Sequence, residues 1–147
     1  MEIKNWILKK HLNNFEIISE NYLPFYKDYL ISKGVIVEED FSKSQSFVNW
    51  NLYPENYKFF YDFEGCENEI TQWLMNSDLS KSKKVSMDLG YNNPIIVLNT
   101  NYFINNWYDF VVGAQYESTL ASEDGKYIME FLKGYDLKSN FLIKKVL

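Results

Sequence analysis

The sequence predicts an α+β fold, in which an antiparallel sheet carries N-terminal and central helices packed on it. Segments with apolar residues at helical spacing alternate with short runs of strand length. Asp124-Gly125 separates two β-compatible runs, which is a strong signal for a hairpin between antiparallel strands. The length of 147 residues, with no internal repeat or linker, predicts one globular α+β domain over residues 1–147.

Four segments show the apolar spacing of a helix. Apolar residues recur every three or four positions from Leu8 to Tyr22, which predicts a first helix over residues 5–22. Further helices are expected over residues 24–33, 67–78 and 100–113. Gly34 and Gly113 stand where the second and fourth should end, because glycine readily follows a helix C-terminus. The third should begin with acidic residues in its first turn, where the helix dipole favours them.

Strand signals fill the remaining segments. We expect strands over residues 35–37, 57–63, 85–89 and 95–98, a hairpin whose arms end at Ala121 and begin near Tyr127, and a last edge strand over 137–146. In the 57–63 run, Phe60 interrupts the polar side of the alternation. Glu130 lies between Met129 and Phe131 in the second hairpin arm, so we expect it to face solvent or to pair with a lysine on a neighbouring strand.

The composition excludes several function classes. All 15 basic residues are Lys, against 20 acids, and the chain holds one His, His11, and one Cys, Cys66. A zinc site built from thiolate and imidazole ligands needs more than these two, and one Cys forms no disulfide within the chain. A nucleophilic pair of Cys66 and His11 stays formally open, although a lone Cys is more often a small buried hydrophobe.

Phosphate and nucleic-acid binding are also disfavoured. The six glycines lie at least nine residues apart, so the glycine-rich loops that cradle nucleotides are absent, and we expect no cofactor. A net charge of −5 without any Arg would repel a polyanion. We interpret the small cluster Lys81, Lys83 and Lys84 as a solvated loop.

Apolar runs are short throughout the chain. The first, Trp6 to Leu8, is too short for a secretory signal, and the run over residues 95–98 is far below the roughly 18–20 residues of a membrane helix. We therefore expect a cytoplasmic protein that binds no membrane.

The negative charge is concentrated in one segment. Residues 38–69 contain eight acids, two lysines and nine aromatic residues. Acids beside Tyr and Trp can bind a basic protein, because the rings supply contact area and the carboxylates steer and pair with its cations. The candidate partner-binding residues are Glu38, Glu39, Asp40, Trp50, Tyr53, Glu55, Asp62, Glu64, Glu67 and Glu69. Trp50 and Tyr53 are the expected exposed anchors, while the alternative is that most of these rings are core.

Other uses of the carboxylates stay open. Two acids about 5–9 Å apart are sufficient for a glycosidase, and carboxylates can hold Mg²⁺ or Ca²⁺, so a carboxylate-dependent hydrolase is the alternative function. The calcium-loop pattern is absent around Asp124-Gly125, which reads as a plain turn, and no metal ligand is assigned. A third possibility is a structural subunit that associates with itself through exposed aromatic residues.

The C-terminal third resembles a group of bacterial proteins. The residues that carry the resemblance are Trp107-Tyr108-Asp109-Phe110, the stretch SEDGKYIMEF (122–131) and Ser139-Asn140-Phe141-Leu142-Ile143. In size and style this region resembles small immunity proteins of contact-dependent or polymorphic toxin systems. The resemblance implies a non-enzymatic inhibitor that binds one cognate toxin domain, often by presenting acids to its basic substrate groove. It assigns no individual residue a role.

Overall fold

The computed structural model describes residues 5–20, 23–39, 46–62, 65–90, 93–115 and 117–143. Seven strands form one antiparallel sheet in the order β1-β4-β3-β5-β6-β7-β2. Their bounds are β1 Phe15–Ser19, β2 Tyr57–Phe60, β3 Lys84–Asp88, β4 Ile95–Asn99, β5 Ser118–Ser122, β6 Ile128–Leu132 and β7 Asp136–Ser139. The antiparallel sheet with helices confirms the predicted α+β class.

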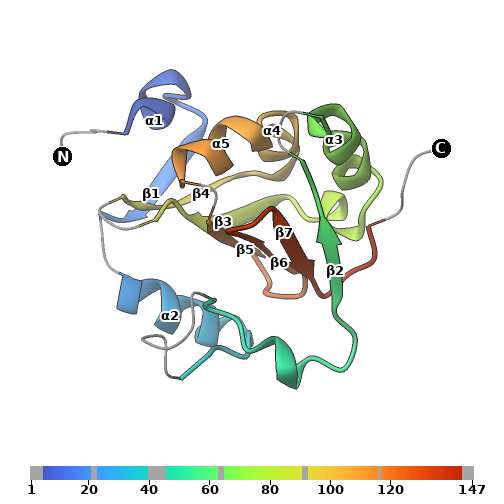
Figure 1. The fold of residues 1–147 in the computed structure, drawn as a ribbon. Coiled ribbons are helices and arrows are strands. Elements are labelled where there is room, and N and C mark those ends of the chain that lie inside the picture. The colour runs from blue at the N-terminus through green and yellow to red at the C-terminus, as the bar shows by residue number, and fades with distance from the viewer. Residues whose placement is uncertain are drawn as a thin grey trace.

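Helices cover both faces of this sheet. The α-helices are α1 Trp6–Lys10, α2 Leu23–Ser32, α3 Glu67–Met75, α4 Thr100–Asn105 and α5 Trp107–Gly113, with short 3₁₀ turns η1 Trp50–Leu52 and η2 Asp78–Lys81. Figure 1 shows α1, α3, α4 and α5 along one face and α2 on the other. No helix among these described segments is both long and apolar enough to cross a membrane.

The two faces build two separate apolar clusters. The larger one contains Trp107, Phe110 and Phe131 and is closed by the four helices of the upper layer in Figure 1. The smaller one places Tyr26 and Leu30 of α2 against the opposite face of the sheet. Burying apolar surface on both faces is the main source of stability for such a layered fold.

The N-terminal region differs from its prediction. One helix was expected over residues 5–22, but α1 ends at Lys10 and β1 begins at Phe15. Asn13 between them has a φ of 74°, a left-handed conformation that Asn tolerates better than most residues. β1 then pairs with β4, where Ile17 lies opposite Ile96. Pairing with a distant strand overrides the local helical spacing, and β-branched residues favour this outcome.

Most later elements agree with their predictions. The structure confirms the second and third helices, the strands near 57, 85 and 95, and the hairpin at Asp124-Gly125. Gly125 has a φ of 76°, and a Cβ at this position would lie 2.0 Å from the carbonyl oxygen of Lys33, so the turn requires glycine on both counts. The expected strand over 35–37 is reduced to one bridge between Val37 and Val48.

Two further elements need correction. The expected helix over 100–113 is interrupted at Asn106, whose side chain donates to the carbonyl of Tyr102, and the N-cap of α4 is Asn99. β7 was expected at the sheet edge, but it lies between β6 and β2, so β2 takes the edge instead. The strand expected over 137–146 is observed as β7, which ends at Ser139, and its residues 144–146 lie outside the described residues.

Candidate protein-binding surface

The candidate acids occupy different environments. Glu39, Glu55, Asp62 and Glu67 are exposed, whereas Glu38 and Glu69 are half-buried. Asp40 and Glu64 lie outside the described residues. Glu67 and Glu69 fall in the first turn of α3, as predicted. The exposed acids therefore lie at the surface and outside the core.

Trp50 is not an exposed anchor. Its side chain is only 6% exposed and belongs to the smaller apolar cluster. Tyr53 is half-buried, with its ring centroid 5.6 Å from that of Trp50 and its hydroxyl accepting a 2.9 Å hydrogen bond from Ile36 N. The expected exposure of Trp50 is wrong, because the indole N–H finds a buried acceptor that local sequence does not reveal.

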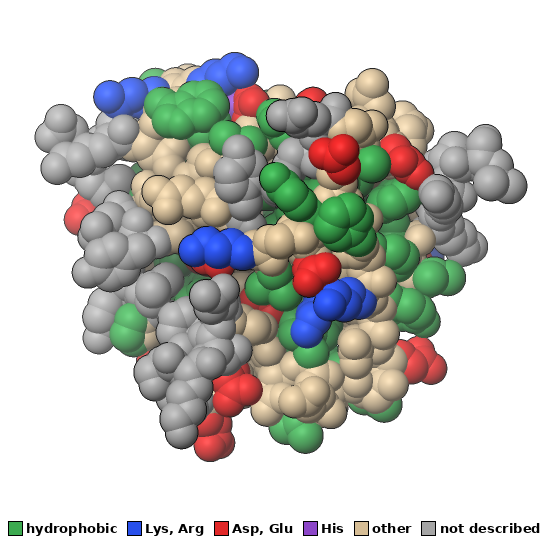
Figure 2. Space-filling model, in the orientation of Figure 1, with side chains coloured by type: hydrophobic (Ala, Val, Ile, Leu, Met, Phe, Trp, Pro, Cys, Tyr) green, Lys and Arg blue, Asp and Glu red, His purple; other side chains and the backbone are tan. Residues whose placement is uncertain are grey.

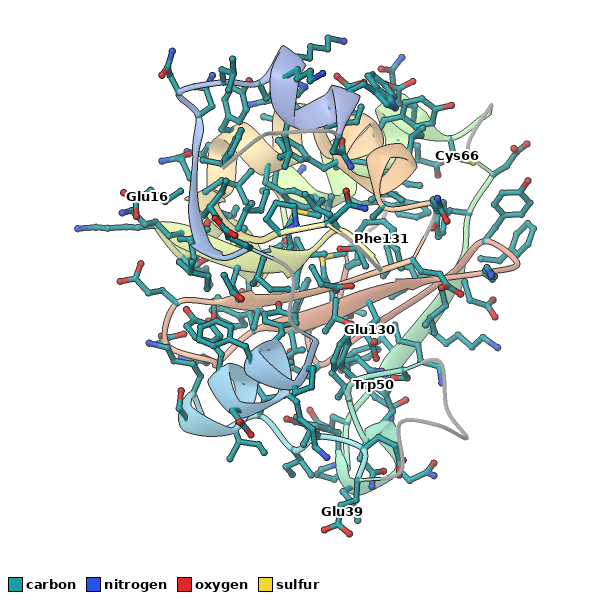
Figure 3. The ribbon with its side chains drawn as sticks, turned by 90° about the vertical axis from the view of Figure 1, so that its left-hand side faces the viewer. Glu16, Glu39, Trp50, Cys66, Glu130 and Phe131 are labelled. Carbon is teal, nitrogen blue, oxygen red and sulfur yellow. The ribbon has the colours of Figure 1, made fainter. Side chains whose placement is uncertain are left out.

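That acceptor is Glu130, which was expected to face solvent or pair with a lysine. It is 1% exposed and accepts hydrogen bonds from four groups. The donors are Trp50 Nε1 at 2.6 Å, Thr119 Oγ1 at 2.6 Å, Phe47 N at 3.2 Å and Ser46 Oγ. Figure 3 shows Trp50 beside Glu130, with Glu39 lying beyond Trp50. Burial raises the pKa of Glu130, and the four hydrogen bonds oppose this rise.

A second buried carboxylate lies in the same sheet. Asp88 accepts a 2.6 Å hydrogen bond from Thr119 N, while the hydroxyl of that threonine donates to Glu130. Burial raises the pKa of Asp88 to about 7. Both carboxylates are enclosed and bonded to protein donors, so their perturbed pKa values have a structural cause and lie away from solvent.

The unique His and Cys do not form a pair. The two ring nitrogens of His11 contact Tyr102 Oη at 2.5 Å and Asp109 Oδ2 at 2.9 Å, and the ring is buried. Cys66 is half-buried at the start of α3. His11 is thus committed to α4 and α5 rather than to a nucleophile. Within the part of the chain that the structure describes, no three His, Cys, Asp or Glu residues are grouped to hold a metal.

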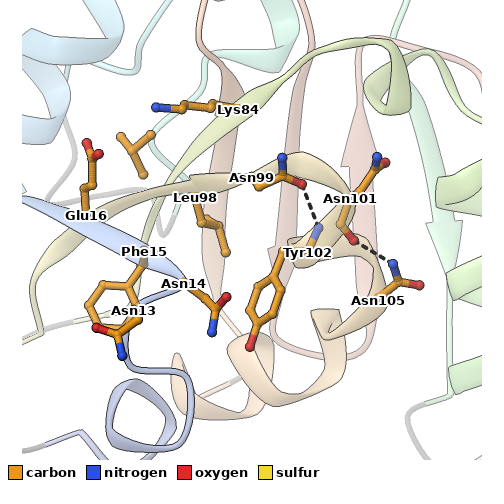
Figure 4. Close-up of a pocket in the computed structure, with 11 residues that line it drawn as sticks. Asn13, Asn14, Phe15, Glu16, Lys84, Leu98, Asn99, Asn101, Tyr102 and Asn105 are labelled. Carbon is orange, nitrogen blue, oxygen red and sulfur yellow. Dashed lines mark hydrogen bonds between the residues drawn. The ribbon is translucent and has the colours of Figure 1, made fainter.

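A hollow lies where β1, β4 and α4 meet. It has a volume of about 520 Å³ and is lined by Asn13, Asn14, Phe15, Glu16, Lys84, Val97, Leu98, Asn99, Asn101, Tyr102 and Asn105. Figure 4 shows two of its amides in hydrogen bonds: Tyr102 N donates to Oδ1 of Asn99, and Nδ2 of Asn105 donates to the carbonyl of Asn101. Glu16 is the only acid among the described residues that line it, and these residues do not supply the two converging carboxylates of the hydrolase alternative.

A second hollow holds the lysine cluster. Its volume is about 500 Å³, and Lys81, Lys83 and Lys84 line it together with Lys33, Ser82, Glu123 and Asp124. Hydrogen bonds from Lys126 N and Ser122 Oγ lower the pKa of Asp124. A carboxyl that stays ionised in this way is poorly suited to act as a general acid near neutral pH.

The most exposed large apolar side chain lies on β2. Phe60 is 69% exposed, and its ring meets that of Tyr135, which is 45% exposed, at a centroid distance of 6.1 Å and an angle of 90°. Figure 2 shows hydrophobic side chains with acidic ones beside them over β2. The only sequence signal was Phe60 on the polar side of its strand, and Tyr135 was missed because it lies in the turn before β7.

Acids flank this ring pair along the chain. Residues 51–62 and 65–69 hold Glu55, Asp62, Glu67 and Glu69 against one lysine. That lysine, Lys58, is paired with Asp136 on β7 at 3.3 Å. We call the ring pair, together with the exposed acids that precede and follow β2 in the chain, the β2 surface; its members are Glu55, Phe60, Asp62, Glu67 and Tyr135.

No protein-family model matches the chain, and no curated protein matches it.

Proposed function

We propose that this protein is a non-enzymatic protein-binding module, an inhibitor of the immunity-protein type, which occludes a basic toxin domain with its acidic, aromatic β2 surface. In this proposal it acts in the bacterial cytoplasm and needs no cofactor. The observation that carries it is Phe60, a large ring held 69% in solvent on a strand flanked by acids. Exposed aromatic residues with charged neighbours are typical of protein interfaces.

The two parts of the surface have different roles. Phe60 and Tyr135 supply apolar contact area, so truncating them should shorten the lifetime of the complex. Glu55, Asp62 and Glu67 are exposed and should act mainly on the association rate by attracting a basic partner. Glu38 and Glu39 stay candidate partner-binding residues. Trp50 contributes indirectly, because its hydrogen bond to Glu130 holds the segment that precedes β2.

The arrangement of the buried acids also supports binding over catalysis. Glu130 and Asp88 are the enclosed carboxylates with raised pKa values, and both are held by backbone or side-chain donors. Their hydrogen bonds explain their presence as structural groups. The hydrolase alternative needs a carboxyl of raised pKa in an open hollow, whereas Glu130 and Asp88 are enclosed.

The test uses two variants with the same charge change. Glu55→Gln/Glu67→Gln neutralises exposed acids on either side of β2, and Glu16→Gln/Glu20→Gln neutralises two exposed acids at β1, the opposite sheet edge. Tagged protein is used to capture partners from a lysate of the native organism at low and raised salt. The captured partner is then purified, and binding rates and inhibition of its activity are measured.

We expect one basic partner that elutes with salt and is inhibited at a one-to-one ratio. The β2 variant should associate about tenfold more slowly at low salt, and the β1 variant should behave as the wild type. Equal association rates for both variants would contradict the proposed surface. Sedimentation at two concentrations separates this function from self-association, which would give a mass that rises with concentration.

A further inference from the structure

β2 is an edge strand with one unpaired side. It stands at the end of the sheet order, and its one neighbouring strand among the described residues is β7. Figure 1 shows β2 at the outside of the sheet. An open edge is a template for another strand, and native proteins normally protect it with bulges, charges or a covering element.

The backbone register shows which groups face outward. Tyr61 N donates to the carbonyl of Tyr135 at 2.8 Å, so these two residues form a hydrogen-bonded pair. Such pairs alternate with non-bonded ones along an antiparallel ladder. Tyr57 and Phe59 therefore also point their N–H and C=O toward β7, and those of Lys58 and Phe60 point to the open side. None of these outward groups has a hydrogen-bond partner among the described residues.

The opposite edge of the sheet is protected. β1 carries a register shift between Ile17 and Ser19, and bulges of this kind disrupt pairing. Glu16 and Glu20 are exposed there, without a large exposed ring on the strand. β2 pairs with β7 through four consecutive residues without a shift and carries Phe60. The regular edge and the exposed ring thus coincide at β2.

The charge around β2 selects the partner. Glu55, Asp62 and Glu67 flank the strand, and Lys58 is already paired with Asp136. A second copy of this chain would bring the same acids together and be repelled, whereas a basic segment would be attracted.

We propose that an extended, basic segment of the partner adds to the sheet as an eighth strand beside β2. This inference rests on the proposed function and specifies how the partner docks. The added strand forms hydrogen bonds with the backbone of Lys58 and Phe60. Its side chains on the outer face contact the rings of Phe60 and Tyr135, and its cations pair with the flanking acids.

The probe is a synthetic seven-residue peptide of alternating lysine and valine, with a glutamate–valine peptide as its charge control. Binding is followed by amide hydrogen exchange on the full chain. We expect the lysine peptide to slow exchange at Lys58 and Phe60 by at least about tenfold, with no effect at Tyr57 or Phe59 beyond their existing protection. Binding without slower exchange at Lys58 and Phe60, or no binding at millimolar peptide, would overturn strand addition.

A matched pair of variants tests the outward N–H directly. Lys58→Pro removes it, and Lys58→Gln keeps it while removing the same charge. Proline is tolerated here because this N–H does not belong to the ladder with β7. We expect Lys58→Pro to weaken peptide binding at least about tenfold relative to Lys58→Gln, with both folded by circular dichroism. Equal binding by the two variants would overturn the inference.

The captured partner separates this inference from the function it rests on. If Glu55→Gln/Glu67→Gln weakens partner binding but Lys58→Pro and Lys58→Gln bind it equally, the proposed function stands and strand addition fails. If the charge variants bind the partner alike, the proposed function fails as well. If exchange at Lys58 and Phe60 slows with protein concentration alone, a second copy occupies the edge and the basic partner is the wrong occupant.

Discussion

The indole Nε1 of Trp50 donates a 2.6 Å hydrogen bond to Oε1 of Glu130, joining residues 80 positions apart in the chain. With Ser46 and Phe47 bonded to the same carboxylate, residues 46–50 are fastened to the face of the sheet. The segment that leads into β2 therefore depends on one buried acid from the C-terminal hairpin.

Removing this charge should destabilise the fold. Glu130→Gln replaces an acceptor of four donors with a group that has one acceptor oxygen, so at least one buried donor is left unpaired. We expect a loss of about 2–4 kcal/mol in the free energy of unfolding, measured by urea denaturation. Glu123→Gln, at an exposed position, is the matched control and should change stability by less than about 0.5 kcal/mol. Equal effects would contradict the structural role of Glu130.

The raised pKa of Asp88 predicts an unusual pH dependence of folding stability. Its pKa is about 7 in the folded protein and 3.8 in the reference state, so the folded state binds the extra proton between these values. Stability should therefore be highest near pH 4 and fall as the pH rises through 7, by about 4 kcal/mol at most. Glu130, whose pKa is also raised, contributes with the same sign.

The check is urea denaturation at a series of pH values. Asp88→Asn keeps an oxygen to accept from Thr119 N and removes the charge, so this variant should lose most of the slope and exceed the wild type at pH 8. Asp124→Asn is the control at an exposed carboxyl whose pKa is lowered, and it should leave the slope above pH 5 unchanged. If Asp88→Asn kept the full slope of unfolding free energy against pH, the slope would belong to another titrating group.

Phe60 should matter for binding and hardly for stability. Because its side chain is 69% exposed, Phe60→Ser should change the free energy of unfolding by less than about 1 kcal/mol, including its contact with Tyr135. Partner binding should weaken by at least about 2 kcal/mol, roughly 30-fold, as for an interface anchor. Ile31→Ser, at a half-exposed position on α2, is the control and should bind normally. Titration calorimetry with the partner would show whether the two variants differ in binding affinity.

Position 113 should not tolerate a side chain larger than that of glycine. A Cβ there would lie 2.4 Å from Cγ1 of Ile7, where α1 packs on α5. Gly113→Ala should therefore cost about 1–3 kcal/mol of stability. Ile7→Ala removes Cγ1 and leaves only Cβ, which would lie 2.9 Å away, so adding Gly113→Ala to it should cost less than in the wild type. Additive effects in thermal unfolding would show that the two positions do not clash.

Local patterns predicted the elements whose structure is decided locally. Asp124-Gly125 marked its turn because glycine with a positive φ is needed there, and α3 was marked by its apolar spacing and first-turn acids. β1 was misassigned because pairing with β4 decides its conformation. Trp50 was misplaced for a similar reason, since its acceptor Glu130 is distant in sequence. Of the ring pair at β2, the sequence pattern marked Phe60 but gave no sign of Tyr135.

The pairing of β2 with β7 also sets the order in which the molecule can be completed. Residues 57–60 have their strand neighbour in residues 136–139, nearly eighty positions later. During synthesis, β2 therefore waits for β7, the last of the seven described strands, to leave the ribosome before it can join the sheet. The surface that carries Phe60 is assembled last, so a nascent chain presents it only after the rest of the sheet has formed.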